Sequence, residues 1–244
     1  MRRLTDVAMI CAPTWRSRAY AQCFAALDVW PAQVVYLPGR EPDWDGAPVV
    51  EVDLGQTDGP IRFRPATTAQ RTFSEAGVET LISPATDINQ PSVLSLLRDL
   101  PQPVVLYSGP GGLILREPTL SIGKRYLHVH GGYAPQYRGS TAFYFSILRQ
   151  GTIGATALWL DSRIDTGPIL FRRSYPVPKG VEVDRVLDPL VRSDVLRRVL
   201  IERLRRGDFP TGTPSADEAA ETFHVIHPVL KHLALRRCGL ADQP

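Results

Sequence analysis

Cysteine, long apolar stretches and an excess of either charge are all scarce in this sequence. Three cysteines, Cys11, Cys23 and Cys238, are scattered over 244 residues without Cys-x-x-Cys spacing, and their odd number argues against a disulfide framework. Nowhere do about 18 uncharged apolar residues run together, as a membrane helix requires. The arginines near the amino terminus are not followed by the apolar region of a secretion signal. We therefore expect a soluble, cytoplasmic protein with no membrane partner.

The charges are nearly balanced and interspersed. A formal net charge of +3 arises from 28 basic and 25 acidic residues, which gives little support for a nucleic-acid partner. The 43% of hydrophobic residues supply ample material for a core. We predict a main domain over residues 1–206 and a small carboxyl-terminal extension over residues 207–244. A homodimer is compatible with this sequence.

Hydrophobic periodicity alternates between that of strands and that of helices, the pattern of a parallel sheet with crossover helices. The predicted strands cover residues 6–12, 33–37, 80–83, 103–107, 126–130, 155–160 and 169–175, with a further short strand at 49–52 inside a loop. The predicted helices cover residues 16–27, 67–76, 91–100, 140–150 and 183–206. We predict an α/β fold, with a Rossmann-like, mostly parallel sheet and helices on both faces.

Two histidines lie two positions apart at the end of a predicted strand. Alternate side chains of a strand share a face, so His128 and His130 point the same way while Val129 points into the opposite layer. Glycines follow and end the strand, and open α/β sheets form their sites at the carboxyl ends of strands. A single strand histidine is more often structural, but two on one face before a turn favour a functional site.

Two motifs follow in the sequence, and the first of them begins at His130. The first, His-x4-Pro-x-Tyr-Arg-Gly, runs from His130 to Gly139, and the second, Asp-x-x-x-Asp-Thr-Gly-Pro-Ile, runs from Asp161 to Ile169 and includes Asp165. In this order they resemble the folate-dependent formyltransferase family, which includes glycinamide ribonucleotide, methionyl-tRNA and sugar-nucleotide N-formyltransferases. The resemblance is most specific over residues 111–172, and the alternating pattern upstream agrees with it.

The resemblance implies a catalytic site. In the family, an Asn-x-His pair and an aspartate form the site, which corresponds here to His130 and Asp165, with His128 at the position of the asparagine. When an amine attacks a formyl carbon, the oxygen becomes negative and a proton leaves the nitrogen. His128 replaces the amide as a donor only if a ring proton faces that oxygen, through the right tautomer or the imidazolium.

The resemblance also implies the formyl donor, 10-formyltetrahydrofolate. It further implies that two segments, residues 112–116 and 161–165, bind this donor. Backbone groups of these segments would read the pterin edge while apolar side chains cover its ring. The residues expected to bind the donor are Gly112, Leu113, Ile114, Leu115, Asp161 and Ile164.

The acceptor is less well defined. Arg16 and Arg18 begin a predicted helix after the first strand and could receive an anionic substrate, although solvated helix ends also carry arginines. Tyr137 is a third candidate for acceptor binding. Because the chain after residue 206 is short, we expect a small amine, such as an aminosugar nucleotide or an amino-acid-derived intermediate, as the biosynthetic substrate rather than a tRNA.

Three other functions use nearly the same residues. A zinc hydrolase would bind its metal through His128, His130 and Asp161 or Asp165, although the leading hypothesis includes no metal. Hydrolysis of the formyl group is a second alternative. A non-catalytic folate-binding protein that lost the asparagine is a third.

Overall fold

A computed structural model describes the whole chain except residues 45, 56, 58, 216–219 and 241–244. Its centre is a seven-stranded sheet with the strand order β10-β9-β7-β6-β1-β2-β5. These strands are β1 (Arg2–Cys11), β2 (Val29–Tyr36), β5 (Glu79–Ile82), β6 (Val104–Ser108), β7 (Arg125–His130), β9 (Thr152–Trp159) and β10 (Ile169–Pro176). The five strands from β7 to β5 are parallel, whereas β9 and β10 run antiparallel to their neighbours. The predicted mostly parallel α/β sheet is confirmed.

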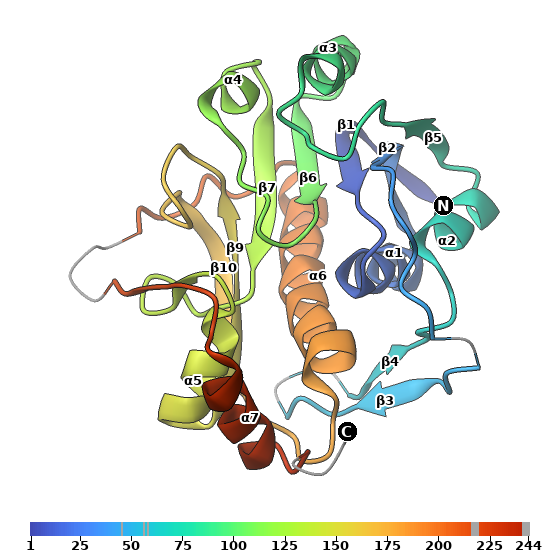
Figure 1. Cartoon of the computed structure of the whole chain (residues 1–244). Helices are drawn as coiled ribbons and strands as arrows, with labels where there is room; N and C mark the ends of the chain where they lie inside the picture. The colour runs from blue at the N-terminus through green and yellow to red at the C-terminus, as the bar shows by residue number, and fades with distance from the viewer. Residues whose placement is uncertain (45, 56, 58, 216–219, 241–244) are drawn as a thin grey trace.

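Helices cover both faces of this sheet (Figure 1). The helices are α1 (Trp15–Leu27), α2 (Ala69–Glu75), α3 (Pro91–Asp99), α4 (Glu117–Leu120), α5 (Ala142–Gln150), α6 (Asp188–Arg206) and α7 (Pro228–Arg237). Alternation along β1 separates two cores, since Val7 and Met9 pack with α1 and α6 while Ala8 and Ile10 pack with α3. In the part of the chain that is described, no helix is both long and apolar enough to cross a bilayer.

Element boundaries differ from the sequence prediction where proline or antiparallel pairing intervenes. Strand β2 begins at Val29 rather than near residue 33 and includes Pro31. A proline is tolerated there because β5 pairs with β2 only from Gln33 onward, so Pro31 has a neighbouring strand on one side only. The predicted helix over 183–206 is divided into a wide turn, η1 (Val183–Leu187), and α6.

Two short strand pairs lie outside the main sheet. Strand β3 (Val50–Val52) pairs with β4 (Ile61–Phe63), which the sequence did not predict, and β8 (Arg138–Gly139) pairs with β11 (Thr222–Phe223). Strand β11 belongs to the predicted extension, so the described part of that extension packs back onto the main body. Its buried residues Phe209, Ile226 and Ala234 join the same core as α1 and α6.

Candidate functional site

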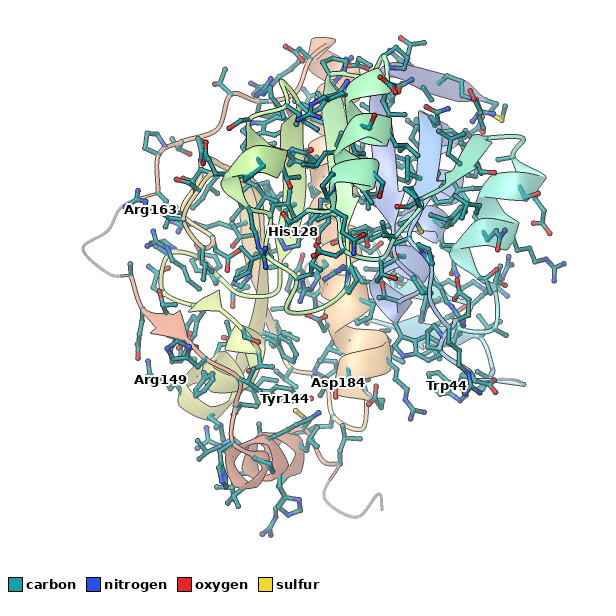
Figure 2. The ribbon with its side chains drawn as sticks, turned by 45° about the horizontal axis from the view of Figure 1, so that its top comes forward. Trp44, His128, Tyr144, Arg149, Arg163 and Asp184 are labelled. Atoms are coloured by element: carbon teal, nitrogen blue, oxygen red, sulfur yellow. The ribbon has the colours of Figure 1, made fainter. Side chains whose placement is uncertain are left out.

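A cavity of about 820 Å³ opens at the carboxyl ends of β1, β6 and β7. Because these strands are parallel neighbours, the segments that follow them meet at one edge of the sheet. The cavity is lined by residues 14–16, 107, 110–115, 128, 130, 139–141, 143, 160–165, 184, 188–189, 192 and 222–225. Figure 2 shows His128 near the middle of the molecule, and Arg163 toward its outer side on the 160–165 loop.

His130 and Asp165, which belong to separate sequence motifs, are in direct contact. The Nδ1 atom of His130 lies 3.2 Å from Oδ2 of Asp165, and its Nε2 lies 2.7 Å from the carbonyl oxygen of Tyr137. The same Asp165 oxygen accepts a 2.9 Å hydrogen bond from the backbone N–H of Gly139. A carbonyl only accepts and this carboxylate already receives one donor, so both ring nitrogens of His130 act as donors. Both ring nitrogens of His130 thus face acceptor oxygens.

Gly132 allows this packing around His130. A Cβ atom at Gly132 would lie 2.5 Å from Nε2 of His130 and would also overlap the Tyr137 carbonyl oxygen. Both groups belong to the hydrogen bond that fixes the ring. Any larger residue at this position would displace His130.

His128 has a different environment, although it shares a face of β7 with His130. Its Nδ1 lies 3.2 Å from the carbonyl oxygen of Tyr107, on the neighbouring strand β6, so Nδ1 carries the proton and Nε2 keeps its lone pair. Burial, assisted by the nearby Arg16 guanidinium, lowers the pKa of His128 to about 3. His128 is therefore a neutral imidazole whose free nitrogen is an acceptor. The geometry does not meet the condition under which it would replace an amide donor.

Two arginines give the inner part of the cavity positive charge. Arg16, in the first turn of α1, donates from Nε to Oγ of Ser108 at 3.3 Å and from Nη2 to the Gly109 carbonyl. Arg192, on α6, donates from Nε to both carboxylate oxygens of Asp188, at 2.9 and 3.0 Å, and from Nη1 to the Val129 carbonyl. Burial lowers the pKa of Arg16, and the positive charge of Arg192 adds to that effect.

All six residues predicted to bind the donor lie on the two loops that line the cavity mouth, residues 110–115 and 160–165. Each loop presents one exposed apolar side chain, since Ile114 and Ile164 are 57% and 46% exposed. Asp161 orders its own loop by accepting hydrogen bonds from the Thr166 hydroxyl, at 2.7 Å, and from the backbone N–H of Arg163, at 3.1 Å.

Two of the predicted acceptor residues lie outside the cavity. Arg18 is 3% exposed and turns away to an ion pair with Glu41 (2.9 Å) and to the carbonyl oxygen of Pro65. The buried ring of Tyr137 stacks on Phe223 at 5.5 Å, and only its carbonyl oxygen reaches the site. Of the three predicted residues, Arg16 alone lines the cavity.

The sequence reasoning missed three contributors. Arg192 lies in an arginine-rich helix where nothing in the pattern separates it from solvent-exposed neighbours. Asn89 holds the 110–115 loop by donating to the Ile114 carbonyl at 3.0 Å and accepting from the Arg116 N–H at 2.8 Å, with no signal beyond a turn before a helix. Residues 222–225 come from the extension, which was expected to be peripheral.

The donor atoms around the two histidines are poorly suited to a shared metal. Both ring nitrogens of His130 and Nδ1 of His128 already have partners in the protein. Within the described ranges, no three His, Cys, Asp or Glu side chains converge on a metal position. A ligand set of His128, His130 and Asp165 would require these hydrogen bonds to break.

Part of the chain is similar in sequence to known formyltransferases. No family model matches the chain. It is 36% identical over 125 residues to a methionyl-tRNA formyltransferase of Chloroflexus aurantiacus, covering 50% of this chain and 40% of that protein. It is 28% identical over 163 residues to the methionyl-tRNA formyltransferase of Caldanaerobacter subterraneus, covering 65% and 52%. The chain is related to the formyltransferases.

Solved formyltransferases share the fold at low identity. Glycinamide ribonucleotide transformylase 1 from Symbiobacterium toebii superposes with a TM-score of 0.57 at 16% identity, over 88% of this chain and 93% of that one. A sugar N-formyltransferase from a Shewanella species gives the same TM-score at 14% identity, over 95% and 87%. The expected formyltransferase fold is confirmed. The chain spans about two fifths of the length of the first curated relative that it matches.

Proposed function

We propose that this protein transfers a formyl group from 10-formyltetrahydrofolate directly to the amine of a small acceptor. One observation carries the proposal: a single cavity joins a His130–Asp165 pair, a neutral His128 and two loops with an apolar rim. The relationship to formyltransferases makes formyl transfer the chemistry that best uses this arrangement.

The cavity suits the folate donor in size and lining. About 820 Å³ falls within the range of sites that enclose much of a drug-sized ligand. Ile114 and Ile164 offer apolar surface from opposite loops to a flat ring, and backbone groups of residues 110–115 are available to its polar edge. When bound, the folate supplies the activated formyl carbon.

His130 would stabilise the charge that develops on the formyl oxygen. Both of its nitrogens face acceptors, Asp165 Oδ2 and the Tyr137 carbonyl oxygen, and a ring that donates to both would hold a positive charge in the cavity wall before the reaction starts. A preorganised positive charge near an oxyanion is typically the largest contribution to acyl-transfer catalysis. Asp165 keeps the imidazole charged and oriented.

His128 would carry the proton. As the amine nitrogen bonds to the formyl carbon, it becomes acidic, and Nε2 of His128 is the free lone pair available to accept the proton. The bond from the formyl carbon to the folate nitrogen then breaks, and the same proton passes to that nitrogen. The low pKa of His128, about 3, favours release of the proton at this second step.

The acceptor in this proposal is a small amine that carries an anionic group. Arg16 lies at the start of α1, where backbone N–H groups also favour anions, and Arg192 faces the same cavity. An aminosugar nucleotide or a carboxylated, amino-acid-derived amine has both the nucleophile and the negative charge. Arg18 takes no part, because it lies outside the cavity.

Formyl transfer is tested with formyl-labelled donor, a panel of anionic amines and mass-spectrometric detection of the formamide. The expected result is a formamide formed together with tetrahydrofolate, at a rate reduced at least about tenfold in His130→Ala. Release of formate without formamide would assign hydrolysis instead. Equal turnover by the wild type and His130→Ala would contradict the proposed site.

A further inference from the structure

The carboxyl-terminal segment from Glu221 to Ile226, hereafter the strap, closes the side of the cavity formed by β8. Its strand β11 pairs in parallel with β8, with Phe223 opposite Gly139. The described part of the extension thus reaches the site that the histidines and Asp165 form. Residues 222–225 contribute directly to the cavity wall.

Backbone alternation links the strap to Asp165. The N–H groups of Arg138 and Ser140 point to one side, where they donate to the strap carbonyls of Glu221 and Phe223, both at 2.9 Å. The N–H of Gly139, between them, points to the opposite side and donates to Asp165 Oδ2 at 2.9 Å. Because successive N–H groups of an extended chain alternate in direction, the strap contacts fix the direction of the Gly139 donor.

Packing around Gly139 makes this arrangement tight. Gly139 has a φ of +88°, a conformation that residues with side chains rarely adopt, and a Cβ there would overlap the backbone of Phe223. The strap therefore lies directly against the glycine whose N–H holds Asp165. No side chain separates the two backbones.

The strap is held in place by two ring stacks, an ion pair and a hydrogen bond. The buried Phe223 ring is stacked between Tyr137, at 5.5 Å, and Phe145, at 4.4 Å. Glu221 forms a two-pronged ion pair with Arg149 of α5, with one Nη2–Oε1 distance of 2.8 Å, and the Thr141 hydroxyl accepts from the Ile226 N–H at 2.9 Å. One of these partners, Tyr137, also contacts the site, through its carbonyl oxygen and His130 Nε2.

We propose that Phe223 is a positioning residue, which docks the strap on β8 so that the Gly139 N–H holds Asp165 against His130. The inference has a structural part, the order of Gly139 and Asp165, that does not depend on the reaction. Its catalytic part rests on the proposed formyl transfer. A protein without that activity would still show the structural part.

Hydrogen exchange and histidine NMR of the full-length protein test the structural part. Phe223→Ala removes both ring stacks, and we expect the Gly139 amide to exchange at least about tenfold faster and the His130 Nδ1 resonance to shift. Phe209→Ala is the matched control, because Phe209 is also a buried ring of the extension but packs on Trp159 of β9. Equal changes at Gly139 in both variants, or none in Phe223→Ala, would overturn the proposal.

A milder pair of variants covers the case in which Phe223→Ala does not fold. Glu221→Arg breaks the exposed ion pair and should accelerate Gly139 exchange, while the double variant Glu221→Arg, Arg149→Glu should restore slow exchange. Failure of the double variant to restore slow exchange would contradict docking through this contact.

Formyl transfer separates positioning from donor binding. If the wild type is active, Phe223→Ala should lower kcat about tenfold and leave the KM for the folate within about twofold, because the strap lines the β8 side of the cavity whereas the donor loops line its mouth. An unchanged kcat would contradict the catalytic part alone. An inactive wild type would contradict the proposed function, and the exchange results would still decide the structural part.

Discussion

Replacement of His128 by asparagine should make the protein less sensitive to acid. The folded-state pKa of His128, about 3, lies below the ordinary histidine value of 6.5, so the unfolded chain binds this proton more tightly than the native protein. The contribution of the neutral His128 ring to the free energy of unfolding is fully present above about pH 6.5, and it is lost as the pH falls toward 3. An asparagine at this position would retain a donor for the Tyr107 carbonyl without a group that titrates in this range.

The magnitude follows from linkage. Each pH unit below 6.5 costs the wild type about 1.4 kcal/mol of unfolding free energy from this residue, until the native ring itself takes up a proton. Between pH 7 and pH 5 the loss amounts to about 2 kcal/mol more than in His128→Asn. Other titrating groups act in both proteins, so the difference between them isolates His128.

Urea denaturation at pH 7 and pH 5, followed by tryptophan fluorescence, measures this difference. The account predicts that the wild-type free energy of unfolding falls by about 2 kcal/mol more than that of His128→Asn. Equal losses in the two proteins would refute the assignment of His128 as a buried neutral imidazole. A greater loss in the variant would also refute it.

Three further outcomes are expected. Asp165→Asn should lower kcat for formyl transfer at least about tenfold, because His130 loses the carboxylate that pairs with its Nδ1; unchanged turnover would remove Asp165 from the mechanism. Gly132→Ala should destabilise the fold by about 1–3 kcal/mol in denaturant titrations, because the added methyl group overlaps the His130–Tyr137 hydrogen bond; a neutral effect would mean that the ring has room to move. Arg18→Ala should destabilise by about 2 kcal/mol without raising the acceptor KM, because Arg18 lies outside the cavity; a raised KM with full stability would restore it as a binding residue.

The sequence was sufficient for the parts of the fold and site that depend on local periodicity. Alternation along residues 126–130 placed His128 and His130 on one face, and both line the cavity. Asp165 lies beside His130 because its loop, between β9 and β10, follows the strand that pairs with β7. The loops around Ile114 and Ile164, predicted to bind the donor, line the same cavity.

What the sequence could not supply depends on partners distant along the chain. The tautomer of His128 is set by the carbonyl of Tyr107, 21 residues earlier, and no local pattern reports that register. The position of Arg18 near a helix start predicts an anion ligand, but Glu41 and the Pro65 carbonyl oxygen, both distant in sequence, bind its guanidinium instead. The two-residue strand at Thr222–Phe223 is too short to show a period, so its pairing with β8 appears only in three dimensions.

The central claim, that this cavity binds the folate formyl donor, is tested most directly by calorimetric titration with a stable 10-formyltetrahydrofolate analogue. The titration compares the wild type, its metal content measured beforehand, with Ile164→Asp, which places a charge on the exposed apolar rim. The account predicts saturable one-site binding to the metal-free wild type, weakened at least about tenfold in the variant. No binding by the wild type, or equal binding by both proteins, would contradict it.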